Sequence, residues 1–227
     1  MRYLVLASDY DGTLARHGKV SEQTIEALER VVASGRKLLL VTGRRLQDVQ
    51  RAFSRTDLFS CIVAEDGAVL YFPASSTEKL LGEAPPERFI QALQERGVEP
   101  VVVGRVIVAT LHPYETTVLE VIRELGIERQ IIFNKGNVMV LPSGVNKGSG
   151  VAAALQELEI EPHQVVSVGD AENDHSFLAQ SGFAVAVGNA LPALKEQADY
   201  VTKAENGEGV RELIELLLTD NLPKKEV

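Results

Sequence analysis

The stretch that most constrains the fold of this chain is residues 3–14, with the sequence YLVLASDYDGTL. Its first half is an apolar run of the length and character of a buried parallel strand. Asp9 and Asp11 stand one residue apart where this strand ends, and Gly12 follows. Two adjacent buried carboxylates repel each other unless a cation or a hydrogen-bond donor is present. An Asp-Gly turn explains Asp11 and Gly12 but not Asp9, so we interpret both acids as functional residues at a ligand-binding strand end.

A second strand is predicted to end beside the first. Ser21 is suited to cap a helix, and the apolar run 37–41 then leads to Thr42 and Gly43. The order strand, helix, strand forms a right-handed unit with parallel strands, so Thr42 falls at the same sheet edge as Asp9. A hydroxyl and a glycine N–H group suit a phosphate oxygen there. The alternative is an ordinary strand-to-helix turn capped by Thr42.

Two later segments are predicted to bring polar groups to this edge. Asn146 is suited to cap a helix, which places Lys147 in the first turn, where a cation is unfavourable unless an anion is bound. A solvated surface lysine is the alternative. The run 165–169 is another buried strand. If it neighbours the first strand, the polar residues that follow it face Asp9. The polar residues that follow it are Asp170, Asn173 and Asp174.

Residues 82–143 break the alternation of strands and helices. Their order is helix, strand, strand, helix, strand, strand, which indicates a small α+β unit inserted into an α/β fold. We therefore expect a Rossmann-like core of residues 1–81 and 144–227, with a parallel sheet and helices on both faces, and an inserted cap of residues 82–143.

Polar residues within the strands and turns of the insert are candidates for substrate contact. A guanidinium among strand residues suits a planar anion, although solvated surface side chains are the alternative. These candidates are Arg105, Asn134 and Lys135.

Composition and charge exclude several classes of protein. The 227 residues carry a formal net charge of −9 and no basic cluster, which argues against nucleic-acid binding. No apolar run approaches the roughly 20 residues of a membrane span, and no signal peptide is evident, so we expect a cytoplasmic protein. The single cysteine, Cys61, lies in an apolar stretch and is predicted to be a small buried hydrophobic residue. The polar tail, residues 220–227, is expected to fray or to act as a linker.

Four motifs, taken in order, resemble those of the haloacid dehalogenase superfamily of phosphatases. They are Asp9-x-Asp11-Gly12-Thr13, Thr42-Gly43-Arg44, Lys147 and Gly169-Asp170-x-x-Asn173-Asp174. The insert resembles the larger cap of the Cof-type branch, which includes archaeal-type phosphoglycolate phosphatases, sucrose-phosphate phosphatases and other sugar phosphatases. Asp66 stands where members of that branch usually carry Asn.

The resemblance implies a Mg²⁺-dependent phosphatase that hydrolyses a small phosphorylated metabolite, either a sugar phosphate or phosphoglycolate. Asp9 would be the nucleophile that forms an aspartyl-phosphate, and Asp11 would be the general acid and base. The metal would be held by Asp9, the Asp11 backbone carbonyl and Asp170, with Asp174 orienting them. The phosphoryl group would be held by Thr42, Gly43, Lys147 and Asn173. Two alternatives stay open, a phosphomutase of the same superfamily and a regulatory module that binds a phosphorylated ligand without hydrolysing it.

Overall fold

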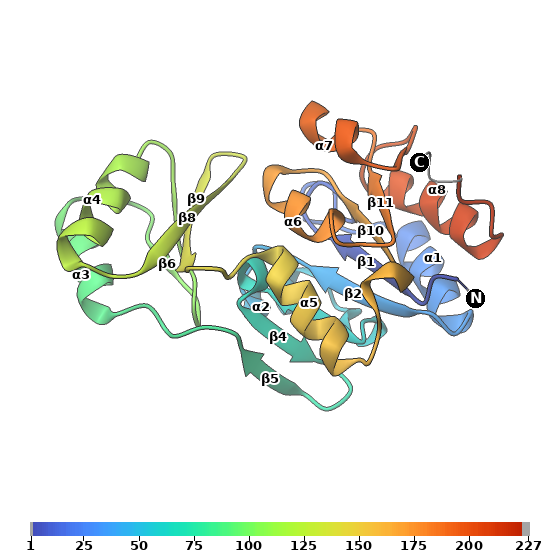
Figure 1. Cartoon of the computed structure of the whole chain (residues 1–227), viewed down its shortest axis with the longest axis horizontal. Coiled ribbons are helices and arrows are strands. Elements are labelled where there is room, and N and C mark those ends of the chain that lie inside the picture. The colour runs from blue at the N-terminus through green and yellow to red at the C-terminus, as the bar shows by residue number, and fades with distance from the viewer. Residues whose placement is uncertain (1, 224–227) are drawn as a thin grey trace.

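The computed structural model describes residues 2–223, and its larger part is built on an eight-stranded sheet (Figure 1). The strands lie in the order β12-β11-β10-β1-β2-β3-β4-β5. Their bounds are β1 Val5–Asp9, β2 Lys37–Val41, β3 Cys61–Ala64, β4 Val69–Phe72, β5 Thr77–Leu80, β10 Val165–Gly169, β11 Phe183–Ala186 and β12 Tyr200–Val201. The strands from β12 to β3 are parallel, and β4 and β5 form an antiparallel edge. All five residues of β1 are buried, as a central parallel strand requires.

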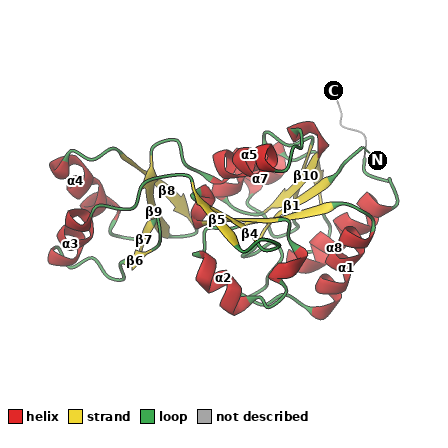
Figure 2. Cartoon of the chain, turned by 90° about the horizontal axis from the view of Figure 1, so that it is seen from below, coloured by secondary structure: helices red, strands yellow, loops and turns green. Residues whose placement is uncertain are grey.

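Helices cover both faces of this sheet. Figure 2 shows α5 and α7 above the sheet and α1, α2 and α8 below it. The bounds are α1 Glu22–Ala33, α2 Leu46–Ala52, α5 Lys147–Glu157, α6 His175–Leu178, α7 Pro192–Gln197 and α8 Asn206–Leu218. The predicted caps are present, because the side chains of Ser21 and Asn146 accept hydrogen bonds from Thr24 N and Ser149 N at 3.2 and 3.0 Å. The predicted fold class, a parallel α/β core with helices on both faces, is therefore confirmed.

A second, smaller sheet lies beside the core (Figure 1). It is antiparallel, in the order β6-β7-β9-β8, and is accompanied by two helices. The bounds are α3 Glu87–Glu95, β6 Val102–Val103, β7 Val108–Leu111, α4 Glu115–Leu125, β8 Arg129–Asn134 and β9 Asn137–Pro142. Residues of α3 and α4 pack with Val108, Val138 and Val140 into a hydrophobic cluster of their own. We propose that residues 82–143 form a cap domain, which this separate sheet and cluster support.

Another apolar cluster joins the two parts. Ala68 of the core packs with Val106, Ile107, Met139 and Leu141 of the smaller sheet and its β6–β7 turn. One face of the smaller sheet therefore packs on α3 and α4, and the other is turned towards the core.

Two other expectations concern the chain as a whole. Cys61 is fully buried, and burial raises the pKa of its thiol to about 12, so it is the inert hydrophobic residue that the sequence predicts. Within residues 2–223, no helix has the length and apolar character needed to cross a bilayer. The predicted fraying of the tail concerns residues 220–227, of which 224–227 lie outside the described residues.

Candidate active site

Three parallel strands bring the predicted site residues to one edge of the core sheet. β1 lies between β10 and β2, with Ser8 opposite Val168 and Asp9 opposite Val41. Asp9 therefore ends β1 between the turn that follows β2 and the turn that follows β10. The strand of residues 165–169 does neighbour the first strand, which was the condition for its polar residues to face Asp9.

Lys147 is the charged centre of this site. Its side chain is 2% exposed, and Nζ donates hydrogen bonds of 2.6 Å to both Asp9 Oδ1 and Asp174 Oδ1. Burial alone would lower the pKa of Lys147, but the charges of Asp174 and Asp9 raise it above its ordinary value. The anions that the sequence analysis expected beside a lysine in the first turn of α5 are thus present, and they are the carboxylates of Asp9 and Asp174.

Three acids are placed to hold a cation. Ligand atoms of Asp9, Asp170 and Asp174 all lie within 4.8 Å of one another. Asp9 Oδ2 is buried without a hydrogen-bond partner, and burial together with the charge of Asp174 raises the pKa of Asp9. Lys147 and Lys135, the latter from the turn between β8 and β9, supply two positive charges against these three acids, so a divalent cation would offset the remaining negative charge. Carboxylate oxygens are also the ligands that Mg²⁺ prefers, so the residues fit a Mg²⁺ ion.

The remaining contacts of Asp170 and Asp174 hold both acids in place. Thr13 Oγ1 donates to Asp170 Oδ1 at 3.1 Å. Asp174 Oδ2 accepts from the backbone N–H groups of Asp170 and Ala171 at 2.8 and 2.9 Å. Since Asp174 also accepts from Lys147, its oxygens are already engaged, which suits the orienting role expected for it.

Asp11 is placed differently from Asp9. Its carboxylate accepts two hydrogen bonds of 2.6 Å from Nε and Nη2 of Arg44, and its side chain is 45% exposed. The fork of a guanidinium fixes the plane of a carboxylate, so Arg44 holds Asp11 at the mouth of the site. An exposed carboxyl can exchange protons with solvent, whereas buried Asp9 cannot do so as readily.

Groups suited to a phosphoryl oxygen lie on the side of Thr42. A Cβ atom placed on Gly43 would lie 3.7 Å from Asp66 Oδ1 and 4.0 Å from Asn173 Nδ2. Asn173 Nδ2 donates to Asp66 Oδ1 at 2.7 Å, and Asn173 Oδ1 and Asp66 Oδ2 are buried without partners. Thr42 and Gly43 thus follow the strand beside β1, Asn173 lies near Gly43, and Lys147 is hydrogen-bonded to Asp9 at the end of β1. Asp66 lies beside Asn173, and burial raises its pKa to about 6, so below that pH it carries a proton that it can donate, as Asn would.

The cap contributes one of its three predicted residues directly to this group. Lys135, in the turn between β8 and β9, makes an ion pair with Asp170, and its Nζ would lie 2.7 Å from a Cβ atom on Gly12. Gly12 has a φ of +91°, so glycine is required there for its backbone conformation and for this approach. Asn134 lies in the same hairpin, with a buried side-chain oxygen that has no partner. Arg105 does not join the group, because its side chain is 66% exposed and its guanidinium lies 3.6 Å from Glu78.

Sequence reasoning missed several residues of the site. Thr13 and Arg44 were part of quoted motifs but had no assigned role, although a hydroxyl or guanidinium beside a site acid is a signal for one. Met139 had no signal at all, since an apolar residue in a strand reads as core. Its Sδ lies 3.5 Å from the Cβ position of Gly43, so this residue of the smaller sheet lies against the turn after β2.

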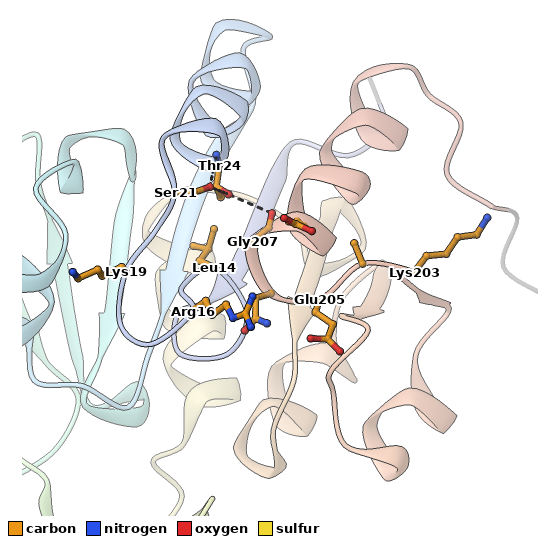
Figure 3. A pocket seen from close by; sticks show the side chains of 11 residues that line it. Leu14, Arg16, Lys19, Ser21, Thr24, Lys203, Glu205 and Gly207 are labelled. Atoms are coloured by element: carbon orange, nitrogen blue, oxygen red, sulfur yellow. Dashed lines mark hydrogen bonds between the residues drawn. The ribbon is translucent and has the colours of Figure 1, made fainter.

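A cavity of about 380 Å³ lies apart from these acids, between the N-terminal ends of α1 and α8 (Figure 3). Leu14, Arg16 and Lys203 are among the side chains that line it. Thr24 Oγ1 donates to Gly207 O at 3.4 Å across its wall. None of the site's acids lines it, so we place the reaction at the end of β1 instead.

Comparisons with known proteins point in one direction. A family described as haloacid dehalogenase-like hydrolase matches residues 6–113 and 114–214. The chain is 32% identical over 220 residues to a protein of Methanothermobacter thermautotrophicus named phosphoglycolate phosphatase, covering 92% of this chain and 96% of that protein. It is 30% identical over 227 residues to phosphoglycolate phosphatase 2 of Saccharolobus solfataricus, covering 98% and 95%. In structure it resembles a haloacid dehalogenase-like hydrolase from Bacteroides thetaiotaomicron, with a TM-score of 0.79, 20% identity and coverage of 95% and 99%.

Proposed function

Because this chain belongs to the haloacid dehalogenase-like hydrolases and is a phosphatase, we propose that it hydrolyses a small phosphate monoester through a phosphorylated Asp9. The observation that carries the proposal is the surroundings of Asp9. One of its oxygens is held by Lys147, and the other is buried without a partner beside Asp170 and Asp174. A carboxylate oxygen left free at the end of a central strand is available as a nucleophile.

Two proton transfers complete the reaction. Asp9 forms a bond to phosphorus as the ester P–O bond breaks, and Asp11 gives its proton to the departing alkoxide oxygen. Asp11 then takes a proton from a water molecule that attacks phosphorus. The bond between phosphorus and Asp9 breaks, which releases phosphate and restores the Asp9 carboxylate. Asp11 is suited to both transfers because it is half-exposed and lies two residues from the nucleophile. Arg44 keeps the Asp11 carboxylate oriented between the two proton transfers.

The charge on the transferred group is met by groups of the core. We propose that Lys147, the Gly43 backbone, Thr42 and Asn173 bind the phosphoryl oxygens. Asp9, the Asp11 carbonyl and Asp170 would hold Mg²⁺, with Asp174 orienting them. When bound, Mg²⁺ would supply positive charge that reduces the repulsion between an anionic nucleophile and a phosphate ester. The cytoplasmic location expected from the sequence stays a prediction.

The cap and the relatives both support a proposal for the substrate class. Lys135 of the cap reaches Asp170, and Met139 of the cap lies against Gly43. The organic part of the substrate would therefore lie beside one positive charge, in a site that the cap narrows. This favours a small anionic group, and the relatives named phosphoglycolate phosphatase agree with a short carboxylate. We therefore propose phosphoglycolate first and small sugar phosphates second.

A phosphate-release screen over phosphorylated metabolites with Mg²⁺ tests this function, with Asp9→Asn as the control. We expect phosphoglycolate to be hydrolysed with the highest kcat/KM and the control to be inactive. Release of phosphate by Asp9→Asn at the wild-type rate would refute the mechanism. Transfer of the phosphoryl group to a second sugar in place of water would indicate a phosphomutase.

A further inference from the structure

A buried carboxylate outside the reacting group links the core to the cap. Glu65 follows β3 in a short 3₁₀ turn, Glu65–Gly67, and is 1% exposed. Its Oε1 accepts from the backbone N–H of Arg105 at 2.9 Å, and its Oε2 accepts from Val106 and Ile107 at 2.9 and 3.1 Å. A buried carboxylate with three N–H donors is well satisfied, and hydrogen bonds to a charged group are stronger than neutral ones.

The cap side of this contact is shaped for the carboxylate. The three N–H groups belong to the turn between β6 and β7, and a Cβ atom on Gly104 would lie 2.5 Å from Glu65 Oε2. Any larger residue at Gly104 would therefore displace the carboxylate. Arg45 of the core adds a hydrogen bond of 3.2 Å from Nη1 to Val103 O. A cavity of about 260 Å³ lies against this contact, with Glu65, Gly104 and Glu78 in its lining.

The core side of the contact is tied to the phosphate-binding turn. Glu65 and Asp66 have φ values of +51° and +56°, in the left-handed region that non-glycine residues rarely adopt. Backbone hydrogen bonds hold them there, from Glu65 N to Arg44 O at 2.9 Å and from Asp66 N to Thr42 O at 3.0 Å. The carboxylate that holds the cap is therefore fixed relative to Thr42 and Arg44.

We propose that Glu65 is a positioning residue, which holds the β6–β7 turn so that the cap lies in register over the phosphate-binding turn. This inference deepens the proposed function and rests on it only for its kinetic consequence. Substrates that need the cap should depend on Glu65, and substrates that use only the phosphoryl site should not.

Hydrogen exchange tests the contact without any substrate. In Glu65→Gln the amide nitrogen of the new side chain would face N–H donors, so we expect exchange at residues 105–107 to become tenfold faster or more. The matched control is Glu78→Gln, which changes a glutamate that lines the same cavity. Glu78 lies 3.6 Å from the exposed Arg105 guanidinium but bonds to none of these three N–H groups, so the control also removes any contribution of that ion pair. Unchanged exchange at residues 105–107 in Glu65→Gln would overturn the proposal, whatever the activity of the enzyme.

Kinetics then test the consequence. We expect Glu65→Gln to lower kcat/KM for phosphoglycolate tenfold or more, mainly through KM, and to change that for para-nitrophenyl phosphate less than threefold. Equal losses on both substrates would indicate a general loss of structure and would overturn the positioning role. If neither substrate is hydrolysed by the wild type, the proposed function fails while the exchange result still decides the contact.

A second pair of variants keeps the test independent of how well Glu65→Gln folds. Gly104→Ala disturbs the contact from the cap side, so it should reproduce the faster exchange. Glu65→Ala removes the carboxylate that a Cβ atom at position 104 would meet. Adding Gly104→Ala to Glu65→Ala should therefore have little further effect. Additive effects of the two substitutions would contradict the proposal.

Discussion

Replacing Asp66 by Asn should stabilise the protein above pH 6 and not below pH 4. Burial raises the pKa of Asp66 from 3.8 to about 6, so between these values the folded protein keeps a proton that the unfolded chain has lost. Stability therefore falls as pH rises through this window. Each tenfold change in proton affinity is worth about 1.4 kcal/mol, so ionising Asp66 costs the folded state about 3 kcal/mol at neutral pH.

Asn at this position removes the ionisation and keeps most of the contacts. Its carbonyl oxygen can still accept the hydrogen bond from Asn173. Its NH₂ group would take the position of Asp66 Oδ2, which has no hydrogen-bond partner, and leaving that donor unpaired costs about 1 kcal/mol. The net gain at about pH 7.5 is then about 2 kcal/mol. It should fall to zero at about pH 4.5 and become a loss of up to about 1 kcal/mol at lower pH.

Urea unfolding of wild type and Asp66→Asn across this pH range measures the difference. The control is Asp57→Asn, since exposed Asp57 is hydrogen-bonded to Arg55, which lowers its pKa, and its Asn variant should show no gain in stability at neutral pH. If the free energies of unfolding of wild type and Asp66→Asn differ by a constant amount at every pH, Asp66 is not protonated by its burial and the reasoning is wrong.

The other predictions concern the reaction itself. Asp11→Asn should slow both steps, yet a phospho-enzyme should still form from para-nitrophenyl phosphate, whose leaving group needs little protonation; rapid quenching that traps none would contradict the acid–base role. Lys135→Ala should raise KM for phosphoglycolate about tenfold, as expected for one lost charged hydrogen bond, and more than Arg105→Ala does; the reverse order would assign the substrate to Arg105. A chelator should abolish activity, and Ca²⁺ should restore it poorly, because its longer bonds and higher coordination number would misplace Asp9. Equal rates in chelator and in Mg²⁺ would rule out the metal role proposed for Asp170.

The parts of the fold that could be predicted from the sequence are those set by strong local patterns. Runs such as residues 165–169 are apolar but for Ser167 and too short for a helix, so a buried strand fits them best. Topology rules then bring their ends to one edge, and this is why Asp9, Thr42 and Asp170 could be placed together before any coordinates were known.

Weak local patterns explain the elements that sequence reasoning missed. All four residues of β5 are exposed, so Thr77–Leu80 has no buried face, and its strand forms because β4 offers a free edge. The short helices α2 and α6 are likewise held by their packing, because isolated helices of this length are unstable.

Long-range contacts explain the pairings that sequence reasoning could not give, including that of Lys135, which was itself a candidate. Lys135 meets Asp170 and Glu65 meets Val106 because the cap folds over the core, and no local pattern encodes those distances. The placement of Arg105 shows the same limit. A cation in a strand region was expected to face the substrate, but the turn before β7 directs it towards Glu78.

The central claim is that Asp9 carries the phosphoryl group, and mass spectrometry of acid-quenched enzyme tests it most directly. During turnover of phosphoglycolate with Mg²⁺, the peptide that contains Asp9 should gain the mass of one phosphoryl group. The gain should disappear in Asp9→Asn and should persist longer in Asp11→Asn, in which the second step lacks its base. Phosphorylation of another residue would contradict the account. So would turnover by wild type if no phosphorylated peptide is found in wild type or in Asp11→Asn.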